Sequence, residues 1–153
     1  MNRKSIEGYE GLYDIDDQGN VYSLKFDKER ILKPADNGNG YYQVNLCKDG
    51  KRKKHHIHRL VAEAFIKNPD NKLQVDHENG DRKDNRISNL RWVTHQQNCF
   101  NTKAKGCTFD KRAGKWRAQI IVDRKYIYLG YHDTEEEAHA AYLKAKEKYH
   151  IIE

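Results

Sequence analysis

Hydrophobic and turn-forming residues alternate over short distances in the first third of the chain. Residues 12–15 and 21–24 have the apolar content of short strands, and the polar stretch between them ends in Gly-Asn, a typical turn composition. From 42 to 46, apolar side chains occupy every second position, which is the period of a half-buried strand. The Asp-Gly pair at 49–50 favours a type I′ hairpin turn. The pattern predicts an antiparallel β module over residues 1–56.

The pattern becomes helical at the centre of the chain. Apolar residues from 57 to 65 follow the i, i+3, i+4, i+7 spacing of an amphipathic helix. Two short strands are predicted at 73–75 and 90–93, joined by a polar loop that contains an Asn-Gly turn. A Thr-x-x-Gln capping box then predicts that a second helix begins at His95. These elements define a second module over residues 57–103.

Residues 104–153 predict a third module of three short strands and one helix. From 115 to 122 the side chains alternate in character, which leaves Arg117 and Gln119 on the uncovered face of the sheet. A Thr-x-x-Glu capping box at Thr134 begins the helix, and alanines on one face of that helix let it lie close to the sheet. The fold class expected for the whole is α+β: a small modular chain with an N-terminal antiparallel β module, a central mixed module, and a C-terminal three-stranded sheet plus one helix.

Composition limits the size of any one core and favours a polyanionic partner. Hydrophobic residues make up only 37% of the chain and charged residues 34%. Because roughly 45–50% apolar residues are usual, several small cores are expected in place of one large core. The 29 basic residues exceed the 23 acidic ones, for a net charge of +6. This balance favours nucleic acid as a partner, with a basic chain that binds no polyanion as the alternative.

The cysteines and the hydrophobic runs exclude several other classes of protein. The three cysteines are isolated and form no CxxC pair. A disulfide framework is therefore not expected, and a reducing compartment is. No apolar run approaches the roughly 18–20 residues that a membrane span needs, and no signal-type segment is present. We expect a soluble, intracellular protein with no membrane partner.

Three side chains suggest a site for phosphodiester chemistry. Asp76 and His77 follow a predicted strand, and Asn98 lies near the first turn of a predicted helix. A carboxylate and an amide oxygen are a hard-oxygen pair, suited to Mg²⁺ or Mn²⁺ with water completing the shell. A neutral imidazole beside them can accept a proton from an attacking water. The alternative is an ordinary strand end with two exposed polar residues.

The same region resembles the HNH motif of phage and intron-encoded homing endonucleases. The resemblance is carried by His58-Arg59-Leu60-Val61-Ala62-Glu63-Ala64-Phe65, Val75-Asp76-His77-Glu78-Asn79-Gly80, Asn85-Arg86-Ile87-Ser88-Asn89-Leu90-Arg91-Trp92-Val93-Thr94 and Gln97-Asn98. It implies a ββα-metal fold for the central module, built around one divalent ion.

The resemblance also implies a role for each matching residue. His77 would be the general base and Asp76 a metal ligand, while Asn89 would orient the loop and the base. Asn98 would hold the metal at the final position of the motif, where Asn alternates with His. His58 is a secondary candidate for the active site. Many HNH proteins carry a four-cysteine zinc site, which this sequence lacks, so no structural zinc is expected.

A second resemblance covers residues 106–146. Gly106-Cys107, Lys115-Trp116-Arg117-Ala118-Gln119-Ile120, Leu129-Gly130-Tyr131, Thr134, Glu136-Glu137-Ala138 and Ala141-Tyr142 are similar to the Apetala-type domain of plant ethylene-response factors. That family lays a three-stranded sheet in the DNA major groove. The positions that would contact DNA here are Lys105, Arg117, Gln119, Tyr126 and Tyr128. Thr108 and Asp110 replace arginines of that family, so its base preference cannot be carried over. The alternative is a plain solvated face.

A run of cations lies before and at the start of the first predicted helix. The candidates for phosphate contact are Lys51, Arg52, Lys53, Lys54 and Arg59. Such contacts would give affinity without sequence preference, and the alternative is a solvated hairpin tip. The N-terminal residues 6–13 and 19–23 resemble a short module that often precedes HNH motifs in homing enzymes.

The sequence therefore predicts an enzyme, a site-specific DNA endonuclease of the homing type. It would use one divalent ion, Mg²⁺ or Mn²⁺, and no small-molecule cofactor. It would nick or cut double-stranded DNA as a monomer, in the cytoplasm of a phage-infected or bacterial cell. Two alternatives stay open: a catalytically inactive DNA-binding regulator on the same scaffold, and a nonspecific HNH nuclease.

Overall fold

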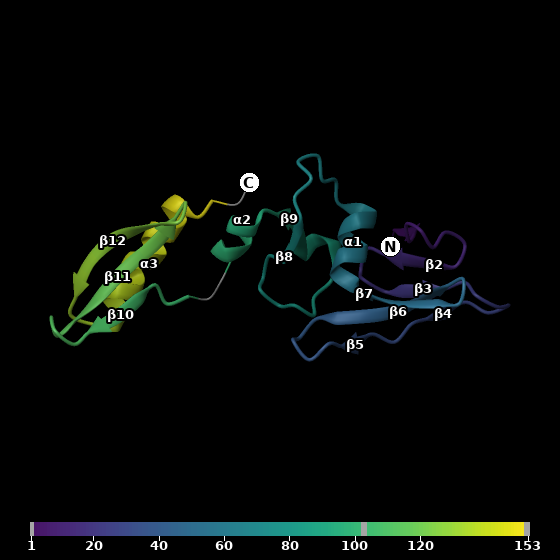
Figure 1. The fold of residues 1–153 in the computed structure, drawn as a ribbon, viewed down its shortest axis with the longest axis horizontal. Coiled ribbons are helices and arrows are strands. Elements are labelled where there is room, and N and C mark those ends of the chain that lie inside the picture. The colour runs from purple at the N-terminus through teal and green to yellow at the C-terminus, as the bar shows by residue number, and fades with distance from the viewer. Residues whose placement is uncertain (1, 102–103, 152–153) are drawn as a thin grey trace. The chain divides into compact units, whose positions relative to one another are not determined.

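The computed structural model describes residues 2–101 and 104–151, and the chain divides into two compact units (Figure 1). The first unit spans Met1–Thr94 and the second His95–Glu153, and each is described by itself. Both units combine helices with small antiparallel sheets, so the predicted α+β class is confirmed. None of the helices in the described ranges has the length and apolar character needed to cross a bilayer.

The first unit begins with a four-stranded antiparallel sheet in the order β1-β2-β3-β4. Its strands are β1 (Arg3–Ser5), β2 (Tyr13–Asp16), β3 (Val21–Ser23) and β4 (Arg30–Ile31). The predicted turn between β2 and β3 is confirmed, and the buried carboxylate of Asp16 organises it. That carboxylate accepts hydrogen bonds from the backbone N–H of Asn20 at 2.8 Å and from the Tyr22 hydroxyl at 2.8 Å.

A second sheet of three strands follows in the order β5-β6-β7. Its strands are β5 (Ala35–Asp36), β6 (Tyr42–Lys48) and β7 (Lys51–His56). Asp49 and Gly50 both have positive φ, 52° and 72°, as a type I′ turn requires. Val44 and Leu46 are buried, so the predicted hairpin and its buried face are both confirmed.

One hydrophobic core joins these sheets to the first helix, α1 (Ile57–Phe65). Helix α1 buries the side chains of Leu60 and Val61, and the same cluster includes residues of β2, β6 and β9. The core therefore continues across the sequence boundary at residues 56 and 57, and it gives the segments on both sides a common support.

Two further strands complete the first unit and carry the candidate site. They are β8 (Gln74–His77) and β9 (Leu90–Val93), paired antiparallel, with the short 3₁₀ helix η1 (Ile87–Asn89) before β9. The first strand was predicted at 73–75, which is wrong at both ends. Leu73 lies outside the strand with 81% of its surface exposed, and pairing continues through His77.

The second unit contains helix α2 (His95–Phe100), which begins where the capping box predicted, and a three-stranded sheet in the order β10-β11-β12. The strands are β10 (Cys107–Asp110), β11 (Lys115–Val122) and β12 (Lys125–His132). Helix α3 (Glu135–Tyr149) runs along one face of this sheet (Figure 1). Its predicted capping box between Thr134 and Glu137 is present.

Close packing between α3 and the start of the sheet depends on one glycine. A Cβ atom at Gly106 would lie 2.0 Å from the ring of Tyr142, and Gly106 has a φ of 66°. Both the space and the backbone conformation therefore require glycine. Ala138, Tyr142 and Ala145 are buried on the same helix face, as the sequence predicted.

Candidate active site

Asp76 and His77 lie side by side at the end of β8, and both are buried. Asp76 is 7% exposed to solvent and His77 is 4% exposed. Strand pairing places Asp76 opposite Arg91 and His77 opposite Leu90. The alternative of a strand end with two exposed polar side chains is therefore wrong, and two buried ionisable groups here need an explanation.

The ring of His77 is held by an amide. Its Nε2 lies 3.3 Å from Oδ1 of Asn85, and because an amide oxygen only accepts, Nε2 carries the proton. In the neutral ring the lone pair is then on Nδ1. Burial lowers the pKa of His77, and the hydrogen bond that its ring donates to Asn85 and the charge of Asp76 only partly oppose this shift. His77 is therefore a neutral imidazole at physiological pH.

Arg91 fixes the carboxylate of Asp76 from the neighbouring strand. Its Nε and Nη2 both donate to Oδ2 of Asp76, at 3.0 and 2.9 Å. A third nitrogen, Nη1, lies 3.5 Å from Glu78. Arg91 was part of the quoted motif but had no predicted role. A role for Arg91 could not be predicted without the register between β8 and β9, which places Arg91 directly opposite Asp76.

Asn89 braces the loop that follows the site. Its side chain accepts a hydrogen bond from the backbone N–H of Asn79 at 3.0 Å and donates to the backbone oxygen of Asp84 at 2.8 Å. The residue that accepts the hydrogen bond from the His77 ring is Asn85. The Arg86 guanidinium holds the pKa of Asp84 at about 2, so this loop carries a fixed ion pair close to the site.

Aromatic and imidazole rings pack against His77. The ring centroid of His58 lies 5.1 Å from that of His77, and Tyr41 lies 5.9 Å away. Burial is the main reason that the pKa of His58 falls to about 3, with the neighbouring His77 and His56 adding to it. Nδ1 of His58 is buried without a hydrogen-bond partner in the described part of the protein. His58 thus presents a neutral ring to the candidate base.

Asn98 lies on α2 in the second unit, so its convergence with Asp76 stays a prediction. Within the described residues, no group of three or more His, Cys, Asp or Glu side chains could hold a metal ion by itself. The donors that the sequence offers are instead one carboxylate and one amide. Such hard oxygens suit Mg²⁺ or Mn²⁺, with water supplying the remaining ligands.

The predicted DNA-contacting cations of the first unit differ in their surroundings. The side chains of the β7 cations are exposed. Arg59 lies on α1, donates to the backbone oxygen of Leu73 at 3.2 Å and is 3.9 Å from Glu63. Arg59 therefore also ties α1 to the segment before β8.

The predicted contacts of the second unit gather on the sheet face opposite α3. Register pairs Gln119 with Tyr128 and Ile121 with Tyr126, and a shift between Ala118 and Gln119 brings Tyr131 opposite Arg117. Tyr126 and Tyr128 are exposed by 69% and 57%.

Lys105 differs from these residues, since it precedes β10 and is paired with Glu135 of α3 at 2.6 Å.

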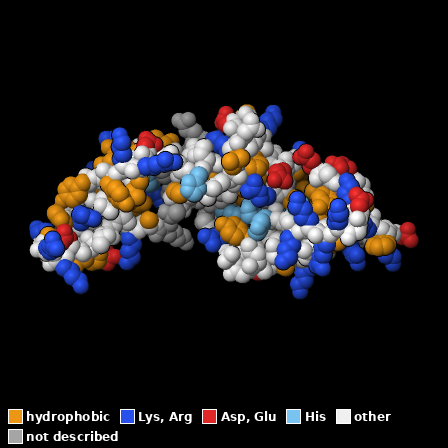
Figure 2. Space-filling model, viewed as in Figure 1, with side chains coloured by type: hydrophobic (Ala, Val, Ile, Leu, Met, Phe, Trp, Pro, Cys, Tyr) orange, Lys and Arg blue, Asp and Glu red, His pale blue; other side chains and the backbone are white. Residues whose placement is uncertain are grey.

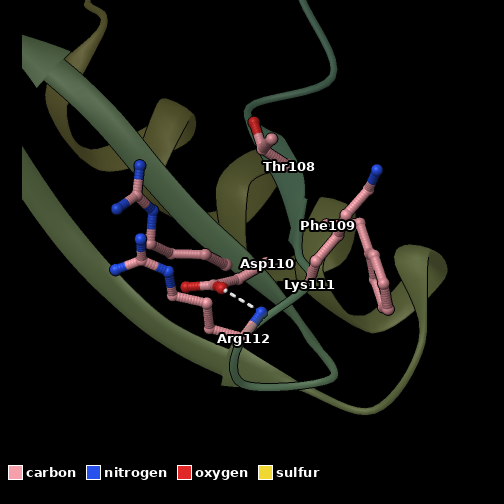
Figure 3. Close-up of a pocket in the computed structure, with 6 residues that line it drawn as sticks. Thr108, Phe109, Asp110, Lys111 and Arg112 are labelled. Carbon is pink, nitrogen blue, oxygen red and sulfur yellow. Dashed lines mark hydrogen bonds between the residues drawn. The ribbon is translucent and has the colours of Figure 1, made fainter.

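Asp110 organises one end of the same face. Its carboxylate accepts hydrogen bonds from the Tyr131 hydroxyl at 2.7 Å and from the backbone N–H of Arg112 at 2.9 Å. Figure 3 shows the side chain of Arg112 beside Asp110 in a surface hollow that Thr108 and Arg117 also line. Hydrogen bonding in the turn after β10 thus fixes the position of the Asp110 carboxylate.

The fold and the site together define a class of small modular nucleases, and comparison with known proteins agrees. The family described as HNH endonuclease matches residues 55–99, the NUMOD4 motif matches residues 1–47, and the AP2 domain matches residues 102–151. HNH nucleases are metal-dependent.

Individual relatives point the same way. The chain is 42% identical over 106 residues to DNA endonuclease I-HmuI of Bacillus phage SP01, covering 69% of this chain and 60% of that protein. It is 47% identical over 96 residues to the uncharacterized HNH endonuclease L247 of Acanthamoeba polyphaga mimivirus, covering 61% of this chain and 23% of the relative. The chain thus spans less than two thirds of the length of these relatives.

A solved structure extends the likeness to the fold. The structure titled "DNA binding and cleavage by the HNH homing endonuclease I-HmuI" matches with a TM-score of 0.63 and 34% identity, covering 84% of this chain and 77% of that one. The chain belongs to the HNH homing endonuclease family.

Proposed function

We propose that this protein is a site-specific DNA endonuclease of the homing type, which hydrolyses phosphodiester bonds in double-stranded DNA with the help of one divalent cation. The observation that carries the proposal is the buried pair of Asp76 and His77, in which the imidazole is kept neutral and is oriented by Asn85. Family membership and the phage relative, whose name is DNA endonuclease, support it.

The cation would be held by Asp76 and Asn98. Both offer hard oxygen donors, which fit Mg²⁺ or Mn²⁺ and do not favour a softer metal. The bidentate contact from Arg91 orients the Asp76 carboxylate before any ligand arrives. When bound, the cation would supply positive charge that stabilises the departing 3′ oxygen.

Side chains of the protein would accept the proton that the attacking water loses. Nδ1 of His77 accepts a proton as water oxygen attacks phosphorus, and Asn85 keeps the other ring nitrogen protonated throughout. The bond from phosphorus to the 3′ oxygen breaks, and that oxygen takes a proton from solvent. The products carry 5′-phosphate and 3′-hydroxyl ends. Because one chain has one such base, a monomer would nick one strand per encounter.

DNA would be held by two surfaces in addition to the catalytic residues. The exposed cations of β7 lie in the same unit as His77, and the exposed face with Arg117, Gln119, Tyr126 and Tyr128 lies in the second unit. Cations bind phosphates without regard to sequence, whereas a sheet face of arginine, amide and tyrosine side chains can contact base edges in the major groove. The net charge of +6 supports such a partner.

Incubation of the purified protein with supercoiled plasmid and Mg²⁺ or Mn²⁺ tests the proposal. Nicked circles and discrete linear products are expected, and sequencing their ends would give the target site. Binding without cleavage would favour the inactive regulator. A smear without discrete products would favour the nonspecific nuclease.

A further inference from the structure

Strand register sorts the cations of β7 onto two faces of the β5-β6-β7 sheet. The buried Leu46 lies directly opposite Lys53, and directly opposed side chains share a face. Lys53 and, two residues before it, Lys51 therefore project on the core side. Arg52 and Lys54 project on the other side, which we call the open face.

The core side of β7 faces other parts of the protein. Lys48, which is opposite Lys51, donates from Nζ to the backbone oxygen of Gly8 at 2.7 Å. His55 lies 3.1 Å from the Tyr9 hydroxyl through its Nε2. Contacts with the N-terminal segment thus lie on the same side of the sheet as Lys51 and Lys53, although these two side chains stay exposed.

The open face is free of negative charge within the described residues of this sheet. The register places on it Ala35, Gln43, Asn45, Cys47, Arg52, Lys54 and His56. The acid of β5, Asp36, shares the opposite face with Tyr42 and forms an ion pair with Lys83 at 3.0 Å. Neither Arg52 nor Lys54 has an acidic partner in the described part of the chain, so both charges are available to a ligand.

The open face continues directly to the candidate base. The ring of His56 lies 5.9 Å from Tyr41 and 5.3 Å from His58, and His58 lies 5.1 Å from His77. Arg82 adds a further cation 5.0 Å above the ring of Tyr41. Figure 2 shows Lys and Arg side chains gathered where Figure 1 places β6 and β7, next to a patch of histidine.

We propose that the open face of β7 binds the backbone of one DNA strand, with Arg52 and Lys54 each contacting one phosphate on the way to the scissile phosphate at His77. The proposal rests on the proposed function, because it takes His77 as the point of cleavage. Side chains two residues apart on a strand are about 6.6 Å apart, close to the separation of neighbouring phosphates along one DNA strand. Lys51 and Lys53 carry the same charges on the same strand and add to the general attraction for DNA, but they do not contact these phosphates.

Two double variants of the full chain separate the faces: R52A/K54A on the open face and K51A/K53A on the core side. Each removes two positive charges from the same exposed strand, so their long-range electrostatic effects match. Affinity for a mixed-sequence DNA duplex is measured from about 50 to about 200 mM salt, since each lost phosphate contact lowers the slope of log K against log salt by roughly 0.9. Thermal melting checks that both variants fold.

The open-face variant is expected to lower that slope by about 1.8, and the core-side variant by less than about 0.5. Equal losses, or a larger loss for K51A/K53A, would overturn the assignment of the open face. Plasmid nicking by the unchanged protein separates the two proposals. If the unchanged protein nicks plasmid and both variants lose slope equally, the endonuclease proposal holds and the surface proposal fails. If the open-face variant loses more slope but the unchanged protein does not nick plasmid, the surface proposal holds and the endonuclease proposal fails.

Discussion

The Nε2 atom of His77 lies 3.3 Å from Oδ1 of Asn85, and this contact decides which ring nitrogen is basic. The amide of Asn85 is itself oriented, because its Nδ2 donates to the backbone oxygen of Lys83 at 3.2 Å. The oxygen of that amide is thereby directed to His77. The proposed general base is therefore oriented both by its own strand and by a loop residue eight positions further along the chain.

Asn85→Ala is expected to slow cleavage while leaving DNA affinity nearly unchanged. The ring of His77 would lose the acceptor that fixes its tautomer, so a smaller fraction of molecules would present Nδ1 to water. A loss of roughly 10- to 100-fold in kcat is expected, below the full contribution of a general base. Single-turnover cleavage measures it, with Lys111→Ala, at an exposed turn position directly after β10, as a control. An unchanged kcat would mean that Asn85 does not orient the base.

Arg91→Ala is expected to destabilise the first unit. The change leaves the buried carboxylate of Asp76 without its bidentate donor, and loss of hydrogen bonds to a buried charge costs about 1.5–3 kcal/mol. Urea unfolding measures the change. Arg86→Ala is the matched control, because Arg86 is itself largely exposed in its ion pair with Asp84, and ion pairs that solvent reaches are worth about 1 kcal/mol or less. Equal effects of the two changes would contradict the assigned role.

Asp16 should make the stability of the first unit depend on acid pH. Burial alone would raise the pKa of Asp16, but hydrogen bonds from Asn20, Tyr22 and Gln18 outweigh it, and the net pKa lies below the ordinary 3.8. A lowered folded-state pKa stabilises the protein above 3.8, and this stability is lost as the pH falls through the folded value. Asp16→Asn should therefore cost more free energy of unfolding at neutral pH than near pH 3. A cost independent of pH would contradict this.

Removal of divalent ions should separate cleavage from binding. EDTA is expected to abolish cleavage and to leave the affinity for duplex DNA within a few-fold, because phosphate contacts come from cations of the protein. Conversely, Mn²⁺ should raise the Tm of the protein but not of Asp76→Ala, since an ion that binds only the folded state stabilises it. Equal shifts in Tm for both proteins would place the ion elsewhere.

The sequence predicted elements whose signals are local. The β6–β7 hairpin follows from apolar alternation and the Asp-Gly pair, and α3 follows from its capping box and its alanine face. The motif residues Asp76 and His77 were found because they are adjacent in sequence and match a known pattern. Such features depend on neighbouring residues only.

Features set by register and packing could not be predicted in the same way. Arg91 reaches Asp76 only because a long loop brings β9 opposite β8 in one register. The extension of β8 to His77 was missed because its last two residues are polar. The packing of His58 against His77 depends on the hydrophobic core that holds α1 in place. No local sequence pattern specifies this packing.

The most direct test of the central claim compares the unchanged protein with His77→Ala on supercoiled plasmid in Mg²⁺ or Mn²⁺. Removal of a general base is expected to lower the rate by at least roughly 10²–10⁴-fold, which leaves no detectable nicking, while DNA affinity stays within a few-fold. Nicking by His77→Ala at an undiminished rate would contradict the account, because a base other than His77 would then activate the water.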